Sequence, residues 1–395
     1  MLKTLTFSTL FPNSVQPIHG IFVANRLSHL LSTGRVSTRV IAPVPFFPSP
    51  NPRYGSYALY AAVPKVEDWS DVPVLHPRYP AVPKVGMTCA PGLLYLGARP
   101  AVAAMLNDGF DFDLIDAHYF YPDGIAAVLL GLTFGKPVVI TARGTDISQI
   151  ANYRLQRRMI LWAASRAVGL ITVCQALKDR LVELGVSDHR INVLRNGVDL
   201  ELFRPHPARE ALRARYGLSG PVVLSVGHLI PRKGHDLVVD AVAEIPGVTL
   251  LIAGEGPELE RLRSQSAARG ISDRVRFLGR IPPIRLAEVY SASDVLVLAS
   301  SREGWANVLL EAMACGTPVI ASSVWGTPEV VTEPEAGALV HERTGTAFAD
   351  ALRRLFLAPP SREATRAYAE RFGWEATTKG QLELFETIAR RQVCP

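Results

Sequence analysis

Two carboxylates, Glu303 and Glu311, lie eight positions apart in the segment of this sequence that is richest in potential chemistry. Gly304 follows the first glutamate in a predicted loop, and the residue pattern predicts a helix from about Ala306 to Gly316. The first amides of a helix are unpaired and partly positive, which suits a diphosphate group. The two carboxylates could then accept hydrogen bonds from sugar and ribose hydroxyls. Taken singly, the simpler interpretation is a first-turn glutamate that favours the helix dipole for Glu303 and a solvated mid-helix glutamate for Glu311.

A histidine and an arginine occur at the ends of two other predicted strands. His118 follows the apolar run Leu114–Ala117, and Arg143 follows the run Val138–Thr141. Ligands of open α/β sheets bind at the carboxyl ends of the strands. His118 therefore has two interpretations, an acceptor-side residue and a buried core histidine. A guanidinium at position 143 cannot act as a base, but it can form a fork of hydrogen bonds to a phosphate or carboxylate.

The elements that must position these residues form two series of short apolar strands that alternate with helical patterns. Continuous runs of Val, Ile and Leu are typical of parallel strands that are covered on both faces. The first series is Leu2–Phe7, Arg39–Ala42, Leu114–Ala117, Val138–Thr141 and Leu170–Val173. The second series is Val222–Val226, Thr249–Ala253, Val275–Leu278, Val295–Ala299 and Val319–Ala321. Two such series predict an α/β protein with two doubly wound domains.

A turn-rich stretch separates the two series. Asn196-Gly197 is a strong turn signal, and Pro205 and Pro207 exclude a continuing helix. The predicted domains are therefore residues 1–204 and residues 205–371. A second stretch, from Val44 to about Pro83, is rich in Pro and Tyr without a clear period and is expected to be a long loop.

The composition limits the class of protein. The chain has 395 residues, of which 48% are hydrophobic and 20% are charged, and this is ordinary for a globular protein. Four cysteines without a C-x-x-C pair indicate a reducing compartment. The longest apolar run, roughly Ile125 to Phe134, is half of the ~20 residues that a membrane span requires. The start of the chain, Leu2–Phe7, reads as a first strand, so a cytoplasmic protein is expected.

The net charge of +6 lies entirely within residues 1–200. Such asymmetry favours an anionic lipid or an acidic ligand, and the lack of a Lys/Arg run makes nucleic acid the weakest of the candidate partners. The stretch Tyr153–Ala167 contains Arg154, Arg157 and Arg158. It could lie on an anionic membrane, or it could be an amphipathic core helix with a solvated basic face.

With Gly304 and the run 311–321, Glu303 and Glu311 resemble the E-x7-E motif of glycosyltransferase family 4. Members of that family are retaining enzymes that use nucleotide sugars. Other segments resemble family motifs at the usual spacing: Pro17–Val23, Asn196–Asp199, Ser225–Gly234, Ala253–Pro257 and Val275–Gly279. The resemblance covers nearly the whole chain. It implies the GT-B fold, with two Rossmann-like doubly wound domains facing a central cleft, and residues 372–395 as a helix that crosses back to the N-terminal domain.

The resemblance also implies roles in donor binding. The lysine matching Lys233 contacts the donor diphosphate, as expected for a cation facing a leaving group. The usual arginine partner is replaced by His228, so Arg232 or a protonated His228 is expected to supply the second cation. The glutamates matching Glu303 and Glu311 contact the donor sugar and the ribose. The implied donor-binding set is Gly20, His228, Arg232, Lys233, Glu303, Gly304, Trp305, Ala306, Asn307 and Glu311.

For catalysis the resemblance implies Lys233, Glu303 and His118, with His118 and Arg143 on the acceptor side. Many relatives carry a histidine where this chain has Arg143, so the role of that histidine does not pass to it. The implied mechanism is front-face attack, in which the leaving diphosphate takes the acceptor proton. No metal and no cofactor is expected; the donor would be a UDP- or GDP-linked sugar, and the acceptor a saccharide or a lipid-linked sugar.

The implied biological setting is the synthesis of cell-surface polysaccharide or glycolipid, and a peripheral position at the inner membrane face is one expectation. Two other function classes stay open. A nucleotide-sugar epimerase of the same fold would turn over a donor without an acceptor. A non-catalytic sugar-binding protein could also keep the fold, although the retained Lys233, Glu303 and Glu311 argue against it.

Overall fold

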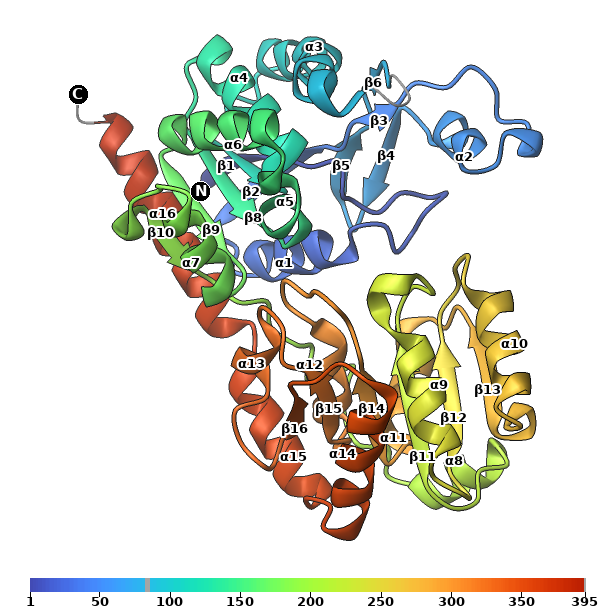
Figure 1. Ribbon diagram of the computed structural model, residues 1–395. Coiled ribbons are helices and arrows are strands. Elements are labelled where there is room, and N and C mark those ends of the chain that lie inside the picture. The colour runs from blue at the N-terminus through green and yellow to red at the C-terminus, as the bar shows by residue number, and fades with distance from the viewer. Residues whose placement is uncertain (82–85, 394–395) are drawn as a thin grey trace. The chain divides into compact units, whose positions relative to one another are not determined.

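A computed structural model describes residues 1–81 and 86–393 of the chain (Figure 1). The chain forms two compact units, unit 1 with residues 1–195 and the segment from 375 onward, and unit 2 with residues 196–374. The predicted boundaries at 204/205 and 371/372 therefore differ from the observed ones. The physical reason is that the Asn196-Gly197 turn pairs with the end of unit 2: the Val198 amide donates to the Phe372 carbonyl at 2.9 Å.

Unit 1 is built on an eight-stranded sheet in the order β10-β9-β8-β7-β1-β2-β5-β4. All neighbouring pairs are parallel except β4 and β5. The strands are β1 (Leu2–Phe7), β2 (Val36–Ile41), β4 (Val66–Trp69), β5 (Val72–Leu75), β7 (Leu114–His118), β8 (Val138–Ala142), β9 (Gly169–Thr172) and β10 (Ile191–Val193). The strands predicted in this half of the chain are confirmed, and β4, β5 and β10 join them.

Helices cover both faces of this sheet (Figure 1). One face packs against α1 (Ile21–Leu31) and the C-terminal helix α16 (Glu375–Val393), whose Leu382, Phe385 and Ile388 share one core with Leu114 and Val139. On the other side of the sheet lie the helices α3, α4 and α6. The helices of unit 1 other than α1 and α16 are α2 (Ser56–Ala62), α3 (Gly86–Asn107), α4 (Ile125–Phe134), α5 (Thr145–Ser148), α6 (Arg154–Arg166) and α7 (Gln175–Glu183).

The stretch 44–83 is not the long loop that its composition predicted. It contains α2, both β4 and β5 of the main sheet, and a small second sheet of β3 (Val44–Pro45) and β6 (Arg78–Tyr79). The strands are short, and the pairing of β5 with β2, of β4 with β5 and of β3 with β6 defines them rather than their residue pattern. Residues 82–83, at the end of the stretch, lie outside the described residues.

Helix α3 is the element that bears on the expected absence of a membrane span. By length and composition alone it could cross a membrane, although the longest uninterrupted apolar run did not indicate such a segment. Pro91 and Pro100 interrupt its pattern, while Leu94, Ala98 and Val102 are fully buried in unit 1.

Of the cysteines, Cys174 and Cys315 are buried and free, Cys89 is exposed and free, and Cys394 lies outside the described residues.

Unit 2 is built on a six-stranded parallel sheet in the order β13-β12-β11-β14-β15-β16. The strands are β11 (Val222–Val226), β12 (Thr249–Ala253), β13 (Val275–Gly279), β14 (Val295–Leu298), β15 (Val319–Ser322) and β16 (Gly337–Val340). The helices are α8 (Arg209–Arg215), α9 (His235–Ala243), α10 (Leu259–Ala268), α11 (Pro283–Ala292), α12 (Asn307–Ala314), α13 (Thr327–Val330), α14 (Gly345–Leu357) and α15 (Arg362–Ala369). The predicted second doubly wound domain is confirmed, with β16 as an additional strand.

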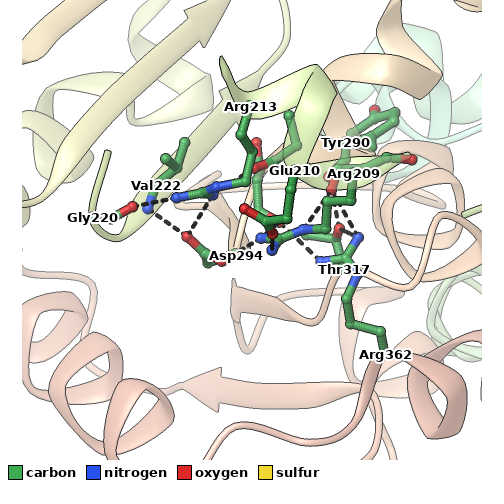
Figure 2. Close-up of polar contacts among 12 residues, drawn as sticks. Arg209, Glu210, Arg213, Gly220, Val222, Tyr290, Asp294, Thr317 and Arg362 are labelled. Atoms are coloured by element: carbon green, nitrogen blue, oxygen red, sulfur yellow. Dashed lines mark hydrogen bonds and ion pairs between the residues drawn. The ribbon is translucent and has the colours of Figure 1, made fainter. Parts of the chain in front are cut away.

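An arginine cluster stabilises the amino edge of this sheet. Figure 2 shows Arg209, Arg213 and Arg362 near Asp294, which directly precedes β14. Arg213 donates to the Asp294 carboxylate at 3.2 Å, and Arg362 donates to the carbonyls of Ser293 at 3.0 Å and Cys315 at 2.9 Å. These carbonyls lie at helix C-termini, which favour cations. The cluster thus holds α11 and α12 at the amino edge of the sheet, opposite to the loops that follow β11 and β14.

Candidate functional site

The donor-side candidates of unit 2 meet where β11 and β14 end. Lys233 lies in the loop after β11 and Glu303 in the loop after β14, and the Lys233 Nζ donates to the Glu303 Oε1 at 2.6 Å. The Ser300 hydroxyl donates to the same oxygen at 2.7 Å. Parallel strands that are neighbours in a sheet bring their carboxyl ends to one edge, so residues far apart in sequence become partners here.

The pKa of Glu303 reflects two opposing effects. Burial of its side chain favours the neutral carboxyl, but the charge of Lys233 and the hydrogen bonds from Lys233 and Ser300 outweigh it, and the pKa is lowered. Glu303 is therefore an ionised, nearly buried carboxylate. Sequence reasoning missed Ser300, whose position one residue after the predicted strand end was the available signal.

Arg232 supplies the second cation at this carboxylate. Its guanidinium NH1 lies 3.8 Å from the Glu303 Oε1 and donates to the Arg302 carbonyl at 2.8 Å. The Ser301 amide also donates to the Arg232 carbonyl at 2.8 Å, so the two loops are bonded to each other. His228, the other candidate for this role, is exposed in the first loop.

A glycine allows this close approach. Gly234 ends the short turn Pro231–Lys233 with a φ of 69° and precedes α9. A Cβ added there would lie 2.1 Å from the Ala299 carbonyl oxygen, which is closer than any real contact. Only glycine therefore fits between the two loops.

The second glutamate of the motif lies within helix α12. Glu311 accepts a hydrogen bond from the Tyr290 hydroxyl at 2.9 Å. Burial raises the pKa of Glu311 to about 7, although this hydrogen bond opposes the shift. Unlike Glu303, Glu311 has no cation among the partners of its carboxylate in the described part of the chain. The two glutamates therefore differ in charge near neutral pH.

The residues between the glutamates form the start of α12. Its helical turns begin at Asn307, with Ala306 as the capping residue, so the amides that follow Gly304 lie at the helix N-terminus. The Trp305 indole donates to the backbone carbonyl of Asn196 at 2.9 Å. The side-chain amide nitrogen of Asn196 donates to the Asn307 Oδ1 at 3.4 Å. These side chains join α12 to the Asn196 turn, so the start of this helix offers a ligand mainly its backbone amides.

On the acceptor side, the structure brings His118 and Arg143 together in unit 1. An Arg143 NH2 group lies 2.8 Å from the His118 Nδ1, and the His118 Nε2 lies 3.3 Å from the Asp116 Oδ2. His118 is only 1% exposed, so it is both at a strand end and buried. Burial and the charge of Arg143 lower the pKa of His118, even though Asp116 opposes this shift.

Arg143 is also buried, and this separates it from an ordinary surface arginine. Burial, together with the charge of Arg26, lowers its pKa to about 9. Its guanidinium lies over the aromatic ring of Phe22, 5.4 Å from the ring centroid. Asp146 accepts hydrogen bonds from the backbone amides of Arg143 at 3.2 Å and Gly144 at 2.7 Å. Sequence reasoning missed Asp116, Asp146 and Arg26, because nothing in their local pattern indicates this proximity.

Gly20 marks the first loop of unit 1. It precedes α1 with a φ of 65°, and a Cβ there would lie 2.2 Å from the Leu10 carbonyl carbon. The loop that it closes lines a cavity of about 210 Å³, together with the ends of β2 and β5. Polar members of the lining are Thr9, Asn13, Gln16, His19, Tyr60, His76 and Tyr79. A polar cavity at the carboxyl edge of an open sheet is a natural place for a small polar ligand.

The basic stretch around α6 is only partly available to a membrane. Arg154 and Arg158 are exposed, whereas Arg157 donates to the Ala151 carbonyl at 2.8 Å and Ile160 is fully buried. Helix α6 therefore packs against unit 1 through its apolar side and shows a small basic surface. Within residues 1–81 and 86–393, no group of three or more His, Cys, Asp or Glu side chains could hold a metal ion.

Two family models match the chain. The model described as Glycosyl transferases group 1 matches residues 209–372, which include every donor-side candidate except Gly20. The model described as Glycosyltransferase Family 4 matches residues 63–202, which include His118 and Arg143.

Curated relatives cover most of the chain. The D-inositol 3-phosphate glycosyltransferase of Acidothermus cellulolyticus is 34% identical over 320 residues, which are 73% of this chain and 70% of the relative. The enzyme of the same name from Frankia alni is 34% identical over 304 residues, or 69% of this chain and 74% of the relative.

Solved structures share the fold at lower identity. Sucrose-phosphate synthase from Thermosynechococcus elongatus has a TM-score of 0.78 at 22% identity and covers 98% of this chain and 99% of its own. The Anabaena protein HepE, solved in complex with UDP and glucose, has a TM-score of 0.74 at 21% identity and covers 98% of this chain and 100% of its own.

Proposed function

Because this chain belongs to glycosyltransferase family 4 and has the GT-B fold, we propose that it transfers a hexosyl or N-acetylhexosaminyl group from a nucleoside diphosphate sugar to an acceptor hydroxyl with retention. The observation that carries the proposal is the ionised Glu303 held by Lys233 beside the start of α12. A carboxylate, two cations and the amides at a helix N-terminus, all at one sheet edge, match the groups of a sugar diphosphate.

Each donor-side residue has a distinct task in this proposal. Lys233 and Arg232 offset the charge that develops on the diphosphate as its bond to the anomeric carbon breaks. Glu303 accepts hydrogen bonds from the sugar hydroxyls, and Glu311 accepts from the ribose. The acceptor oxygen bonds to the anomeric carbon on the face that the diphosphate leaves, and the acceptor proton passes to the departing diphosphate. Position and electrostatics, rather than a protein base, then lower the barrier.

The donor base is proposed to be uracil or guanine, and no further cofactor is required. Support for a uridine nucleotide comes from the structural neighbour HepE, which was solved with UDP and glucose. The acceptor is proposed to be a saccharide or lipid-linked sugar in the synthesis of cell-surface polysaccharide or glycolipid. The curated relatives named for D-inositol 3-phosphate add that compound to the acceptors that should be tested.

A cytoplasmic position at the inner face of the membrane belongs to the same proposal. It is supported by the net charge of +6 within residues 1–200, by the exposed Arg154 and Arg158, and by the exposed rings of Phe46 and Tyr57. Basic and aromatic side chains together favour an anionic bilayer surface. Flotation with anionic vesicles at low and high salt tests it, since binding should be lost at high salt. No binding at low salt would reject this part of the proposal.

The central experiment is a donor screen followed by product analysis. Thermal shift against UDP-, GDP-, ADP- and dTDP-sugars should identify one nucleotide that raises the Tm of the full chain, because a ligand that binds the folded state stabilises it. NMR of the product made with that donor should then show a glycoside with the donor's anomeric configuration. An epimerised nucleotide sugar, formed without acceptor, would replace the transferase proposal by an epimerase.

A further inference from the structure

One face of the sheet in unit 1 has a polar band in the middle of its core. Along β7, Leu114, Asp116 and His118 point to the same face, because side chains alternate along a strand. That face is covered by α1 and α16, and its amino-terminal part is apolar, with Leu114 packed against Phe385 and Ile388. Asp116 and His118 lie farther along the same face, each at most 1% exposed. Buried charged groups of this kind require partners.

The C-terminal helix supplies one of these partners. Gln381 lies one turn before Phe385 on α16 and is 1% exposed. Its Oε1 accepts from the Arg26 Nε at 2.7 Å, and its Nε2 donates to the Asp116 Oδ2 at 3.0 Å. An arginine only donates and a carboxylate only accepts, so the amide has a single possible orientation. Gln381 thus joins a buried cation to a buried anion.

The same reasoning determines the proton on His118. The Nε2 faces the carboxylate of Asp116 at 3.3 Å, and the Nδ1 faces a guanidinium nitrogen of Arg143 at 2.8 Å. Because the guanidinium cannot accept, the Nδ1 must be the unprotonated nitrogen and the Nε2 must carry the hydrogen. A doubly protonated ring would direct an N–H group against the N–H group of Arg143. The network therefore selects one neutral tautomer.

We infer that Gln381 is a positioning residue for the acceptor side: it orients Asp116, which fixes the tautomer of His118 and, through it, the direction of Arg143. Residues from α1, β7, the end of β8 and α16 take part, so the return of the chain to unit 1 brings a functional group to the site. The role in transfer rests on the proposed function, whereas the tautomer does not.

Among the described residues, three charged groups act on the His118 ring. Asp116 and Arg143 contact its ring, and Arg26 acts on it from α1. The backbone carbonyl of His118 accepts from the Ser8 hydroxyl at 3.1 Å. Replacing Gln381 by glutamate adds a negative charge beside Asp116, so the imidazolium form of His118 should become accessible at higher pH than in the wild type.

The test measures the histidine directly in the full-length protein. Ring ¹⁵N spectra distinguish the two neutral tautomers and the imidazolium, and a His118→Gln sample identifies the resonances of His118. In the wild type at pH 7.5, His118 should be the neutral Nε2–H tautomer. In Gln381→Met, Asp116 loses the group that orients it and Arg143 loses the fixed ring, so His118 should become a mixture of tautomers. In Gln381→Glu it should titrate at higher pH. An Nδ1–H or imidazolium ring in the wild type overturns the inference, as does an unchanged ring in both variants.

Thr377→Val is the matched control. Thr377 lies one turn before Gln381 on α16, is buried, and donates through its hydroxyl to the Arg195 carbonyl, but it does not contact Asp116. Its loss should lower the Tm without changing the His118 spectrum. A tautomer change in Thr377→Val equal to that in Gln381→Met would reduce Gln381 to a general packing residue and overturn its positioning role.

Kinetics then connect the network to transfer. With UDP-glucose as donor, release of UDP in the absence of acceptor should stay within about 2-fold of wild type in Gln381→Met. The kcat for transfer to the acceptor should fall about 10-fold, since small displacements of reacting groups are costly. An equal loss of both rates would overturn a role specific to the acceptor side. If the wild type transfers nothing from any UDP- or GDP-linked sugar of the screen, the proposed function fails, and the NMR result still decides the tautomer.

Discussion

The donor-side cluster of unit 2 and the acceptor-side network of unit 1 use similar side chains in opposite ways. Lys233 and Glu303 come from loops at a sheet edge, and in the proposed function the Lys233 cation faces a ligand phosphate. Asp116, His118 and Arg143 are buried among one another. Loop charges can respond to a substrate, whereas buried charges must stay paired in order to remain charged. The first arrangement is suited to chemistry and the second to holding a geometry.

The largest expected effect concerns the stability of the network in unit 1. Asp116→Asn removes the carboxylate that faces His118, Gln381 and the charge of Arg26, so the free energy of unfolding should fall by about 3–5 kcal/mol. The measurement is urea denaturation. Asp111→Asn is the control, because the Asp111 side chain is 75% exposed, and its effect should stay within about 0.5 kcal/mol. Equal stability of the two variants would show that the buried charges of unit 1 do not stabilise the fold, and the contrast with the loop charges of unit 2 would be lost.

The next effect concerns turnover in unit 2. Lys233→Ala should lower kcat by about 10²–10³-fold, as expected when one group that stabilises the leaving charge is lost. Its stability should also fall, because Lys233 is the cation that keeps the nearly buried Glu303 carboxylate charged, so kcat is measured on protein whose folding has been verified. Lys379→Ala, which removes a lysine that is 77% exposed on α16, should keep wild-type kinetics. Steady-state rates with the donor found by screening decide the matter, and near wild-type turnover of a folded Lys233→Ala would place the active site elsewhere.

A smaller effect separates the two glutamates of unit 2. Glu311→Gln should raise the donor KM about 10-fold and leave kcat nearly unchanged, because the ribose does not react. Glu303→Gln should instead lower kcat, since in the proposed function Glu303 contacts the sugar, whose geometry changes during transfer. A kcat loss in Glu311→Gln as large as that in Glu303→Gln would contradict the division of roles.

The raised pKa of Glu311 gives the same variant a second signature. The folded state holds this proton more tightly than the unfolded state, because burial raises the pKa from its ordinary 4.5 to about 7. Stability contributed by this group is therefore lost as pH rises through that window and is level above it. The Tm of Glu311→Gln relative to wild type should rise from pH 4.5 to 7. Burial also raises the pKa of Asp123 to about 7. Because Asp123 is present in both proteins, its contribution to the Tm difference cancels.

The smallest effect is expected at His228. His228→Arg places a permanent cation in the exposed loop where Arg232 already approaches Glu303, so the donor KM should be unchanged or fall by no more than about 5-fold. A drop well beyond that range would show that the second cation of this chain is incomplete. A strongly raised KM would show that the histidine itself contacts the donor.

Much of the fold could be predicted because its signals are local. Continuous Val and Ile runs separated by helical patterns led to both doubly wound sheets, and the strand β14 with its following loop was expected where it lies. The boundary between the units was misplaced, since the pairing of Val198 with Phe372 joins residues far apart in the chain. The short strands β4 and β5 were missed because their partners, rather than their own residues, define them.

For the candidate site, the sequence alone determined the residue types and the strand ends on which Lys233, Glu303 and His118 lie, because motif spacing and strand periodicity are properties of the chain. Only the tertiary structure decided which groups meet: Lys233 with Glu303 across two loops, and Gln381 with Asp116 across most of the chain. Those contacts in turn set the protonation of His118 and the difference between the two glutamates. Charge and tautomer depend on burial and on partners, and both exist only once the sheets and helices have packed.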